Sequence, residues 1–211
     1  KHVLKSVPFY LEGHDLICKV SDFFLKKDSI CYDLGCSTGT LLSKLSSLNT
    51  HKPKIRYIGI DLEPKMIKKA SARKIVNKNI KFINDDLLQF KFKQTDLIIA
   101  YYTIQFIKPS ERQQLINKIY ENLKWGGAFI FFEKVRASDA RFQDIITSLY
   151  NDFKLDNGFS PDEILSKSRS LKGVLEPFST QGNIDLLKRA GFTDIISFMK
   201  FLCFQGFLAI K

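Results

Sequence analysis

The sequence is poor in cysteine, methionine and tryptophan, with four, two and one among its 211 residues. Cys18, Cys31, Cys36 and Cys203 form no CxxC pair, and no histidine stands at metal-ligand spacing from them. We therefore expect four reduced thiols and no metal site, as is usual in the cytosol. Cys31 lies in an apolar run, which predicts a place in the core.

Long hydrophobic runs are also missing. Every apolar stretch is interrupted by Lys, Asp or Gly well before the roughly 20 residues that a membrane-spanning helix needs. The first residues lack the basic start, apolar run and small-residue cleavage site of a secretory signal. These absences predict a cytoplasmic protein without a membrane partner.

Acidic residues are the minority, with 22 Asp and Glu against 33 Lys and Arg and a formal net charge of +11. Such a charge would suit a polyanionic partner such as RNA. However, the lysines are spread along the chain without an Arg-rich block, so a solvated surface explains them. We therefore expect no direct nucleic-acid binding. With 45% apolar and 13% aromatic residues, the composition is that of a globular protein.

Hydrophobic periodicity predicts strands alternating with helices, the pattern of a mostly parallel sheet covered on both faces. The expected strands are Ile30–Leu34, Arg56–Ile60, Ile80–Ile83, Asp96–Ala100, Ala128–Phe132, Ile195–Phe201 and Phe204–Ile210. A helix is expected before the first strand, over Gly13–Lys26. Three more are expected between the first five strands, over Thr40–Leu48, Pro64–Val76 and Pro109–Leu123. Additional helices are expected over Asp139–Phe153, Pro161–Ser168 and Asn183–Ala190. Residues 1–211 thus predict one α/β domain with a Rossmann-like seven-stranded sheet and a helical lid or insert, about 138–190, before the C-terminal β-hairpin.

The most informative segment is Tyr32–Thr40, YDLGCSTGT, at the first turn from strand to helix. Gly35 and Gly39 let the backbone adopt unusual angles and let a ligand approach the main chain. In an open α/β sheet, ligands bind beyond the carboxyl ends of the strands, where this turn lies. The middle glycine of a dehydrogenase GxGxxG is absent. Asp33, two residues before the first glycine, is placed to bind an ammonium, which favours S-adenosylmethionine over NAD.

Polar and aromatic residues follow the other strands at the same expected edge. Asp61 ends the second strand, at a spacing that suits a carboxylate binding ribose hydroxyls. Asp85 and Asp86 follow the third strand, where a carboxylate can meet the adenine amino group. Tyr101 and Tyr102 end the fourth, and their aromatic faces can stabilise a sulfonium cation by about 0.5–2 kcal/mol each.

Three segments carry a family resemblance: YDLGCS, then IGIDLEPKMI, then QFIKPSERQQLINKIYENLKWGGAFIFFEK. They resemble the class I S-adenosylmethionine-dependent methyltransferases, and the most similar branch is that of the carboxy-S-adenosylmethionine synthases. The likeness extends from SVPFY through NDFKLDNGFS to the last hairpin, so it covers nearly the whole chain.

The resemblance implies a specific activity. Members of the branch convert S-adenosylmethionine and prephenate into a carboxylated sulfonium that a partner enzyme uses on wobble uridine in tRNA, and they are homodimers. Matching motifs place Tyr10, Gly35, Cys36, Ser37, Asp61, Leu62, Asp86 and Leu87 at the cofactor. Together with Asp33, Gly39, Met66 and Tyr101, these residues form the predicted binding set for S-adenosyl-L-methionine, or for S-adenosyl-L-homocysteine as product.

Two departures from the branch affect the predicted reaction. Tyr101 stands where the branch has Asn, and Ser168 stands where it has an Arg that pairs with the extra carboxylate. Arg169 comes one residue later, a rotation of about 100° on a helix. Because an Arg fork is difficult to replace, these departures favour a plain methyltransferase acting on a small-molecule or carrier-tethered acceptor. The carboxylating enzyme and a non-catalytic S-adenosylmethionine-binding module remain alternatives.

Methyl transfer would be an in-line displacement in which the protein aligns the nucleophile and excludes water. A hydroxyl or activated-carbon acceptor also needs a base. The candidate catalytic bases are His14, which a helix-start position otherwise predicts to face solvent, and Glu133, which a structural hydrogen bond explains equally well. We expect Tyr102, Tyr150 and Arg169 to contact the acceptor.

Overall fold

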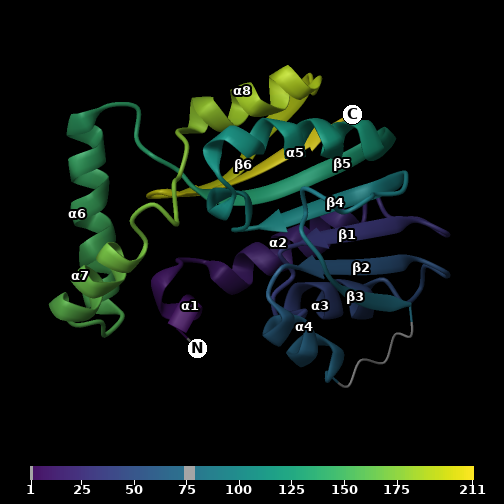
Figure 1. Cartoon of the computed structure of the whole chain (residues 1–211), viewed down its shortest axis with the longest axis horizontal. Helices are drawn as coiled ribbons and strands as arrows, with labels where there is room; N and C mark the ends of the chain where they lie inside the picture. The colour runs from purple at the N-terminus through teal and green to yellow at the C-terminus, as the bar shows by residue number, and fades with distance from the viewer. Residues whose placement is uncertain (1, 74–78) are drawn as a thin grey trace.

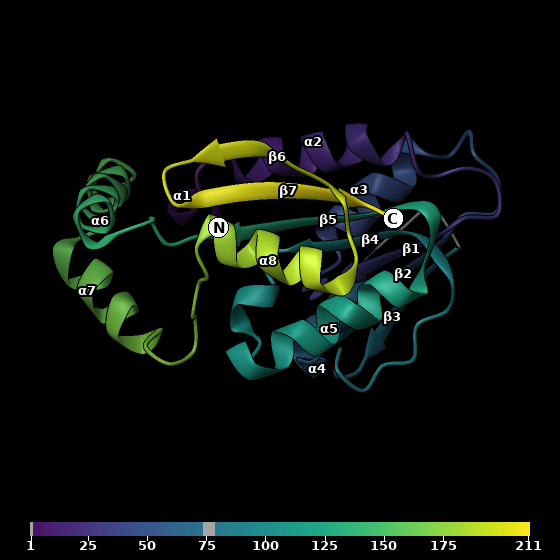
Figure 2. The same ribbon diagram turned by 90° about the horizontal axis from the view of Figure 1, so that it is seen from above.

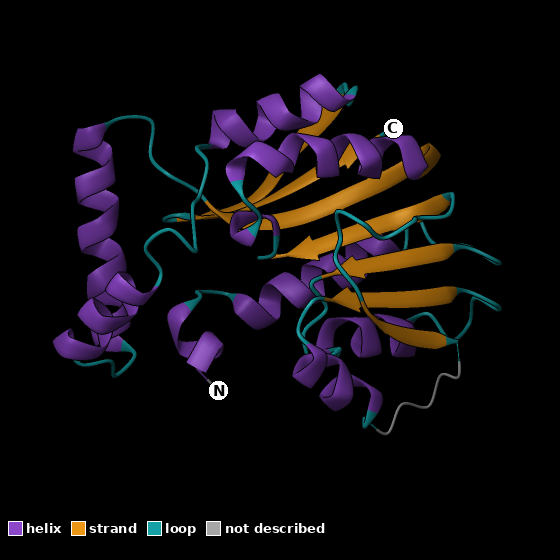
Figure 3. Ribbon diagram, viewed as in Figure 1, coloured by secondary structure: helices purple, strands orange, loops and turns teal. Residues whose placement is uncertain are grey.

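The computed structural model describes residues 2–73 and 79–211 and contains a seven-stranded sheet (Figures 1 and 3). The strand order is β3-β2-β1-β4-β5-β7-β6. The strands are β1 (Ile30–Leu34), β2 (Arg56–Asp61), β3 (Ile80–Asn84), β4 (Thr95–Tyr101), β5 (Leu123–Lys134), β6 (Asp194–Phe201) and β7 (Phe204–Ile210). This is the α/β, Rossmann-like methyltransferase sheet that the sequence predicts.

Strands β1 to β5 run parallel, and the hairpin of β6 and β7 closes the sheet with antiparallel pairing to β5. Every residue of β1 and β4 is buried, which explains why both appear in the sequence as continuous apolar runs rather than alternating ones. Because β1 to β4 are parallel neighbours, their carboxyl ends meet at one edge, which positions the candidate site.

Helices cover both faces of the sheet, as predicted (Figure 2). The helices are α1 (His2–Ser6), α2 (Tyr10–Ser21), α3 (Thr40–Leu48), α4 (Pro64–Ser71), α5 (Pro109–Asn122), α6 (Ala140–Asp156), α7 (Pro161–Ser170) and α8 (Thr180–Ala190), with a 3₁₀ turn, η1 (Ile104–Phe106). One core contains leucines of α3 with Ile17 of α2, and the other joins α5 and α8 to the opposite face. Seen edge-on, α2 and α3 lie on one side of the sheet, and α5 and α8 on the other.

The predicted helical insertion is formed by α6 and α7, which stand apart from the sheet at the side toward which β1 to β5 point (Figure 1). Ser160 begins α7 with a capping box. Neither helix has a buried residue. Phe142, Ile145 and Leu149 of α6 are each about half exposed, at 53%, 47% and 47%. Their spacing places them on one face of the helix.

Several predicted boundaries are wrong. The second helix begins at Tyr10 rather than Gly13, after Phe9 in the left-handed conformation (φ 55°). The helix predicted over Pro64–Val76 ends at Ser71, with Ala72 as its C-cap, and Val76 itself lies outside the described residues. Strand β5 begins at Leu123, which had been placed at a helix end.

The amino end of β5 was missed because its glycines resemble a turn. Instead, Gly126 N–H donates to the carbonyl of Lys211 at 2.7 Å, so the chain end extends the pairing. Trp125, the sole tryptophan of the sequence, is 89% exposed there, at the end of β5 opposite the candidate site.

All four cysteines are buried and unpaired, in agreement with the prediction of reduced thiols. None of the described helices is both long and apolar enough to cross a membrane.

Candidate functional site

The turn after β1 is fixed by backbone contacts with the end of β2. Gly35 N–H and Cys36 N–H both donate to the carbonyl of Ile60, at 2.8 and 3.0 Å. Gly35 (φ 69°) and Gly39 (φ 69°) occupy the left-handed region, which a residue with a Cβ rarely adopts. A Cβ on Gly35 would also overlap the side chain of Thr103, so only glycine fits this turn.

Asp61 joins the turn to the end of β2 with both carboxylate oxygens. Its Oδ2 accepts from Ser37 N–H at 2.8 Å, and its Oδ1 accepts from Glu63 N–H at 2.9 Å. The two segments that the sequence predicts to lie together are therefore in direct contact. Each oxygen keeps a second lone pair, so the carboxylate can still accept hydrogen bonds from ribose hydroxyls.

The end of β3 is adjacent to Asp61. Asp85 N–H donates to the carbonyl of Asp61 at 3.2 Å, and Asp86 Oδ1 accepts from Leu88 N–H at 2.9 Å. Leu87 is 9% exposed. The structure thus brings together the ends of β1, β2 and β3, and we define Asp33, Gly35, Ser37, Asp61 and Asp86 as the strand-end site.

Two predicted cofactor contacts follow β2. Met66 Sδ lies 3.7 Å from Ser37 Oγ, against the turn. Leu62 is 70% exposed, which leaves its side chain open to a ligand.

Asp33 is buried with its Oδ2 unpartnered. Burial, with a contribution from the nearby charge of Asp61, raises its pKa to about 8. A buried carboxyl of this kind ionises readily only when a cation approaches it. The methionine ammonium of S-adenosylmethionine would supply that cation, so the residues of the strand-end site fit the cofactor.

Four aromatic side chains pack together beside the strand-end site, and we call them the aromatic cluster: Tyr10, His14, Tyr101 and Tyr102. The Tyr10 ring is stacked on Tyr102 at 6.2 Å and lies edge-on to Tyr101 at 5.0 Å. Tyr101 Oη donates to the carbonyl of Tyr10 at 2.7 Å, which attaches α2 to β4. Tyr102 Oη is buried and unpartnered, so a ligand could hydrogen-bond to it.

His14 does not face solvent as expected: it is only 3% exposed. It packs between Tyr10 and Tyr101, at 4.8 and 4.7 Å between ring centroids. Burial, and secondarily the charge of Lys44, lowers its pKa to about 4, so the imidazole is neutral at physiological pH. The expectation failed because the helix starts earlier and Tyr101 covers this face. Its role as a base stays a prediction.

Glu133 lies near the end of β5, where it was predicted, and is buried. Its Oε1 accepts from Ile104 N–H at 3.0 Å, which holds η1 against the sheet. Burial raises its pKa to about 8, while Arg112 and backbone N–H groups act in the opposite direction. Glu133 therefore makes the structural hydrogen bond that the sequence analysis gives as the alternative to catalysis. Its role as a catalytic base stays a prediction.

The predicted acceptor residues divide into two groups. Tyr102 and Tyr150 are connected through Phe204, whose ring lies 5.8 and 5.2 Å from theirs. Arg169, in contrast, is exposed on α7, and its side chain forms no hydrogen bond, ion pair or ring contact with the other predicted residues in the described part of the chain.

Sequence reasoning missed Thr103 and Arg112. Thr103 Oγ1 donates to the carbonyl of Leu34 at 2.8 Å and supports the glycine turn. Arg112 is 2% exposed and donates to the carbonyls of Ile107 and Gln105. The position of Thr103, two residues after a buried strand, is a usable signal, whereas an arginine on an amphipathic helix gives none.

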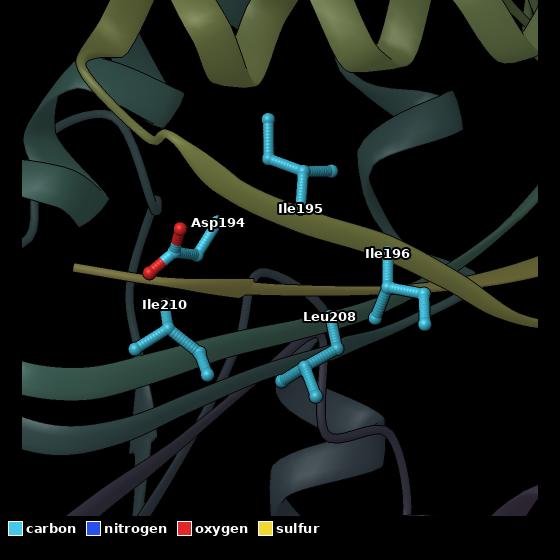
Figure 4. Close-up of a pocket in the computed structure, with 5 residues that line it drawn as sticks. All are labelled: Asp194, Ile195, Ile196, Leu208 and Ile210. Carbon is cyan, nitrogen blue, oxygen red and sulfur yellow. The ribbon is translucent and has the colours of Figure 1, made fainter.

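A separate hollow lies on the surface of the hairpin of β6 and β7 (Figure 4). It is lined by Asp194, Ile195, Ile196, Leu208 and Ile210. Since Ile210 pairs with Ala128 near the amino end of β5, this hollow is away from the strand-end site.

Comparisons with known proteins identify the family of the chain. A model of a methyltransferase domain family matches residues 31–127. A carboxy-S-adenosyl-L-methionine synthase of Staphylococcus epidermidis is 39% identical over 211 residues, covering 100% of this chain and 91% of that protein. Another from Nautilia profundicola is 38% identical over 208 residues, covering 98% of this chain and 88% of that protein.

Solved structures support the fold. Human N-acetylserotonin methyltransferase, in complex with S-adenosylmethionine, superimposes with a TM-score of 0.62 and 19% identity, covering 96% of this chain and 55% of that one. An O-methyltransferase family protein from Burkholderia thailandensis gives a TM-score of 0.66 with 15% identity, covering 96% and 56%.

Fold and site together define an enzyme of the S-adenosylmethionine-dependent methyltransferase class. Within that class, the chain belongs to the family of the carboxy-S-adenosylmethionine synthases, as the full-length identities show.

Proposed function

We propose that the protein is a carboxy-S-adenosylmethionine synthase that takes a carboxyl group from prephenate. The two departures from the family pattern favour a plain methyltransferase over the synthase, and this proposal reverses that ranking. The observation that carries it is 39% identity to a synthase across the whole chain, insertion included, rather than across the cofactor-binding half alone. The strand-end site supports the proposal because its residues fit the cofactor.

The chain's own residues have distinct proposed roles. Asp33 binds the ammonium of the cofactor, Asp61 binds its ribose, and Asp86 binds its adenine amino group. When bound, S-adenosylmethionine supplies the methyl carbon at which a C–H bond is replaced by a C–C bond to the carboxyl group. Prephenate loses that carboxyl and its ring hydroxyl and becomes phenylpyruvate, and the released proton and hydroxide leave as water.

A plain methyltransferase is the second candidate, and one specific observation favours it. Arg169 is exposed on α7, and Ser168 occupies the position of the family's carboxylate-binding arginine. Without a replacement cation, the chain would lack a partner for the extra carboxylate of the product.

We also propose that the enzyme is a cytoplasmic homodimer that acts on a small molecule and does not bind nucleic acid directly. The exposed apolar face of α6 supports self-association, because burying such a face is favourable at about 25 cal/mol per Å². The +11 charge supports no particular partner, since the lysines are dispersed.

Mass spectrometry of the nucleotide that co-purifies with the protein tests the reaction. We expect carboxy-S-adenosylmethionine in a host that makes prephenate, and its loss in a host that does not. Purified protein incubated with S-adenosylmethionine and prephenate should release phenylpyruvate. Recovery of S-adenosylmethionine or S-adenosylhomocysteine alone, with no phenylpyruvate released, would instead support the plain methyltransferase.

A further inference from the structure

Two lysines from different parts of the chain meet at one aromatic ring. Lys134 ends β5, and Lys154 lies in α6 of the insertion. Their Nζ atoms lie 4.6 and 4.4 Å from the ring centroid of Tyr150, both within cation–π range. We call Lys134 and Lys154 the lysine pair.

The lysine pair has no acidic partner in the part of the chain that the structure describes. The ion pairs found there involve Lys44, Lys52 and Lys124 instead. Both members of the pair are half-buried. Burial, together with the charge of Lys134, lowers the pKa of Lys154, so two like charges are held together at a cost.

Nearby groups do not neutralise this charge. The thiol of Cys203 is buried, and burial raises its pKa, so it is uncharged at neutral pH. The face of the Tyr150 ring attracts an ammonium by about 0.5–2 kcal/mol, which is weaker than a desolvated ion pair. The charge of the lysine pair is therefore not balanced by any acidic group in the described part of the chain.

The lysine pair is held in position by its surroundings. Tyr150 Oη donates to the carbonyl of Ser6 at 2.8 Å, which fixes the ring between the insertion and α1. Lys134 N–H donates to Gln105 Oε1 at 2.8 Å, which fixes the end of β5. Such preorganisation lowers the entropy cost of binding a ligand.

The lysine pair is also continuous with the aromatic cluster. Phe204 lies edge-on to Tyr150 and to Tyr102, and Tyr102 is stacked on Tyr10. The lysine pair and the aromatic cluster are therefore joined by one series of packed rings, which leads toward the strand-end site.

We propose that Lys134 and Lys154 bind a carboxylate of the small-molecule substrate beside the Tyr150 ring. Charge-assisted hydrogen bonds of this kind are about twice as strong as neutral ones. The inference rests on the proposed function, in which the carboxyl donor keeps one carboxylate after transfer of the other. It also assigns the insertion a role in substrate binding.

The first test is calorimetric titration of prephenate into the protein saturated with S-adenosylmethionine. We expect Lys134→Met and Lys154→Met each to weaken prephenate binding by about tenfold, as loss of about 1.4 kcal/mol predicts. Arginine at either position should restore part of the affinity. The matched control is Lys211→Met, because Lys211 Nζ lies 4.6 Å from the Tyr120 ring, at the opposite end of the sheet. Unchanged affinity in both lysine-pair variants would overturn the proposal.

Two further measurements distinguish a loss of prephenate binding from effects of the substitutions on folding or activity. Affinity for S-adenosylmethionine should stay within about twofold in all variants, since the strand-end site is intact. Titration of malonate, a dicarboxylate probe, is followed by NMR after ¹³C-methylation of the lysines, which keeps their charge. The resonances of Lys134 and Lys154 are assigned by their loss in the corresponding arginine variants. On addition of malonate both resonances should shift, while the resonance of Lys211 should not.

The outcomes distinguish this inference from the proposed function. Shifts with malonate but no consumption of prephenate would support the anion site and contradict the proposed reaction. Production of carboxy-S-adenosylmethionine at unchanged prephenate affinity in both methionine variants would support the reaction and overturn the anion site.

Discussion

Asp33 combines burial, an unpartnered oxygen and a pKa raised to about 8. In the unfolded chain the same carboxyl ionises near its ordinary value of 3.8. Between these values the folded protein keeps a proton that the unfolded chain has released. Stability therefore falls as pH rises through this window, by at most about 1.4 kcal/mol per pH unit for this residue.

Asp33→Asn should remove this contribution. We expect the free energy of unfolding at pH 7.5 to increase relative to the unliganded wild type, and its decline between pH 5 and 8 to become shallower. Cofactor affinity should fall, because the ammonium loses its counter-charge. Urea unfolding across this pH range measures the first effect, and calorimetry the second. The control is wild type saturated with S-adenosylmethionine, whose free energy of unfolding should also depend less steeply on pH. Identical slopes for unliganded wild type, saturated wild type and Asp33→Asn would contradict the role assigned to Asp33.

Asp61 has two tasks, since its carboxylate accepts from Ser37 N–H and Glu63 N–H and is proposed to bind ribose. Asp61→Ala should weaken S-adenosylmethionine binding by more than about tenfold and destabilise the fold by about 0.5–1.5 kcal/mol, because two exposed N–H groups exchange their acceptor for water. Asp61→Asn keeps one carbonyl oxygen, so its cofactor affinity and its stability should lie between those of Asp61→Ala and the wild type. Unchanged affinity on calorimetry would show that the ribose site lies elsewhere.

Individual residues of the site were predictable where they are adjacent to a strand end. Parallel strands bring the turn after β1 and Asp61 together in any register, and the structure has them hydrogen-bonded. The environment of His14 was not predictable, since it depends on Tyr101 of β4. The lysine pair likewise depends on a contact between β5 and α6 that no local pattern encodes.

At the scale of elements, α2 is coupled to β4 by close contact. A Cβ on Gly13 would overlap Tyr101 Oη, the group that donates to the Tyr10 carbonyl. The predicted cofactor contact Tyr10 and the candidate base His14 therefore share a helix whose packing on β4 depends on one glycine.

Gly13→Ala should destabilise the protein by about 1–3 kcal/mol, because overpacking and loss of the Tyr101 hydrogen bond outweigh the better helix propensity of alanine. The matched control is Gly182→Ala in α8, where the nearest atoms would lie at an ordinary 3.4 Å. That substitution should be neutral or stabilise by up to about 1 kcal/mol. Thermal unfolding measures both, and equal effects would contradict the role assigned to Gly13.

Elements were predicted best where burial is complete. Strands β1 and β4 are buried throughout, and their bounds follow the apolar runs closely. The amino end of β5 was missed because Gly126 is paired with the distant Lys211. Tertiary pairing there overrides the local turn signal.

At the scale of the whole molecule, the insertion presents an apolar face that the described part of the chain leaves about half exposed. Ile145→Asp in α6 should shift a homodimer toward monomer, because a buried charge at an interface is costly. Thr147→Asp, about 200° away around the helix, is the matched control and should leave the dimer intact. Light scattering after gel filtration measures both. A monomeric wild type, or a dimer unaffected by Ile145→Asp, would contradict dimerisation through this face.

The exposed indole at the remote end of β5 determines which optical signals are informative. Trp125 is already 89% exposed in the folded protein, so its emission should have the wavelength of hydrated indole before any denaturant is added. Unfolding and cofactor binding should then change it little, and far-ultraviolet circular dichroism is the better observable. Conversely, Tyr102→Trp would place a fluorophore in the aromatic cluster, where quenching on addition of S-adenosylmethionine would report a ligand beside the strand-end site.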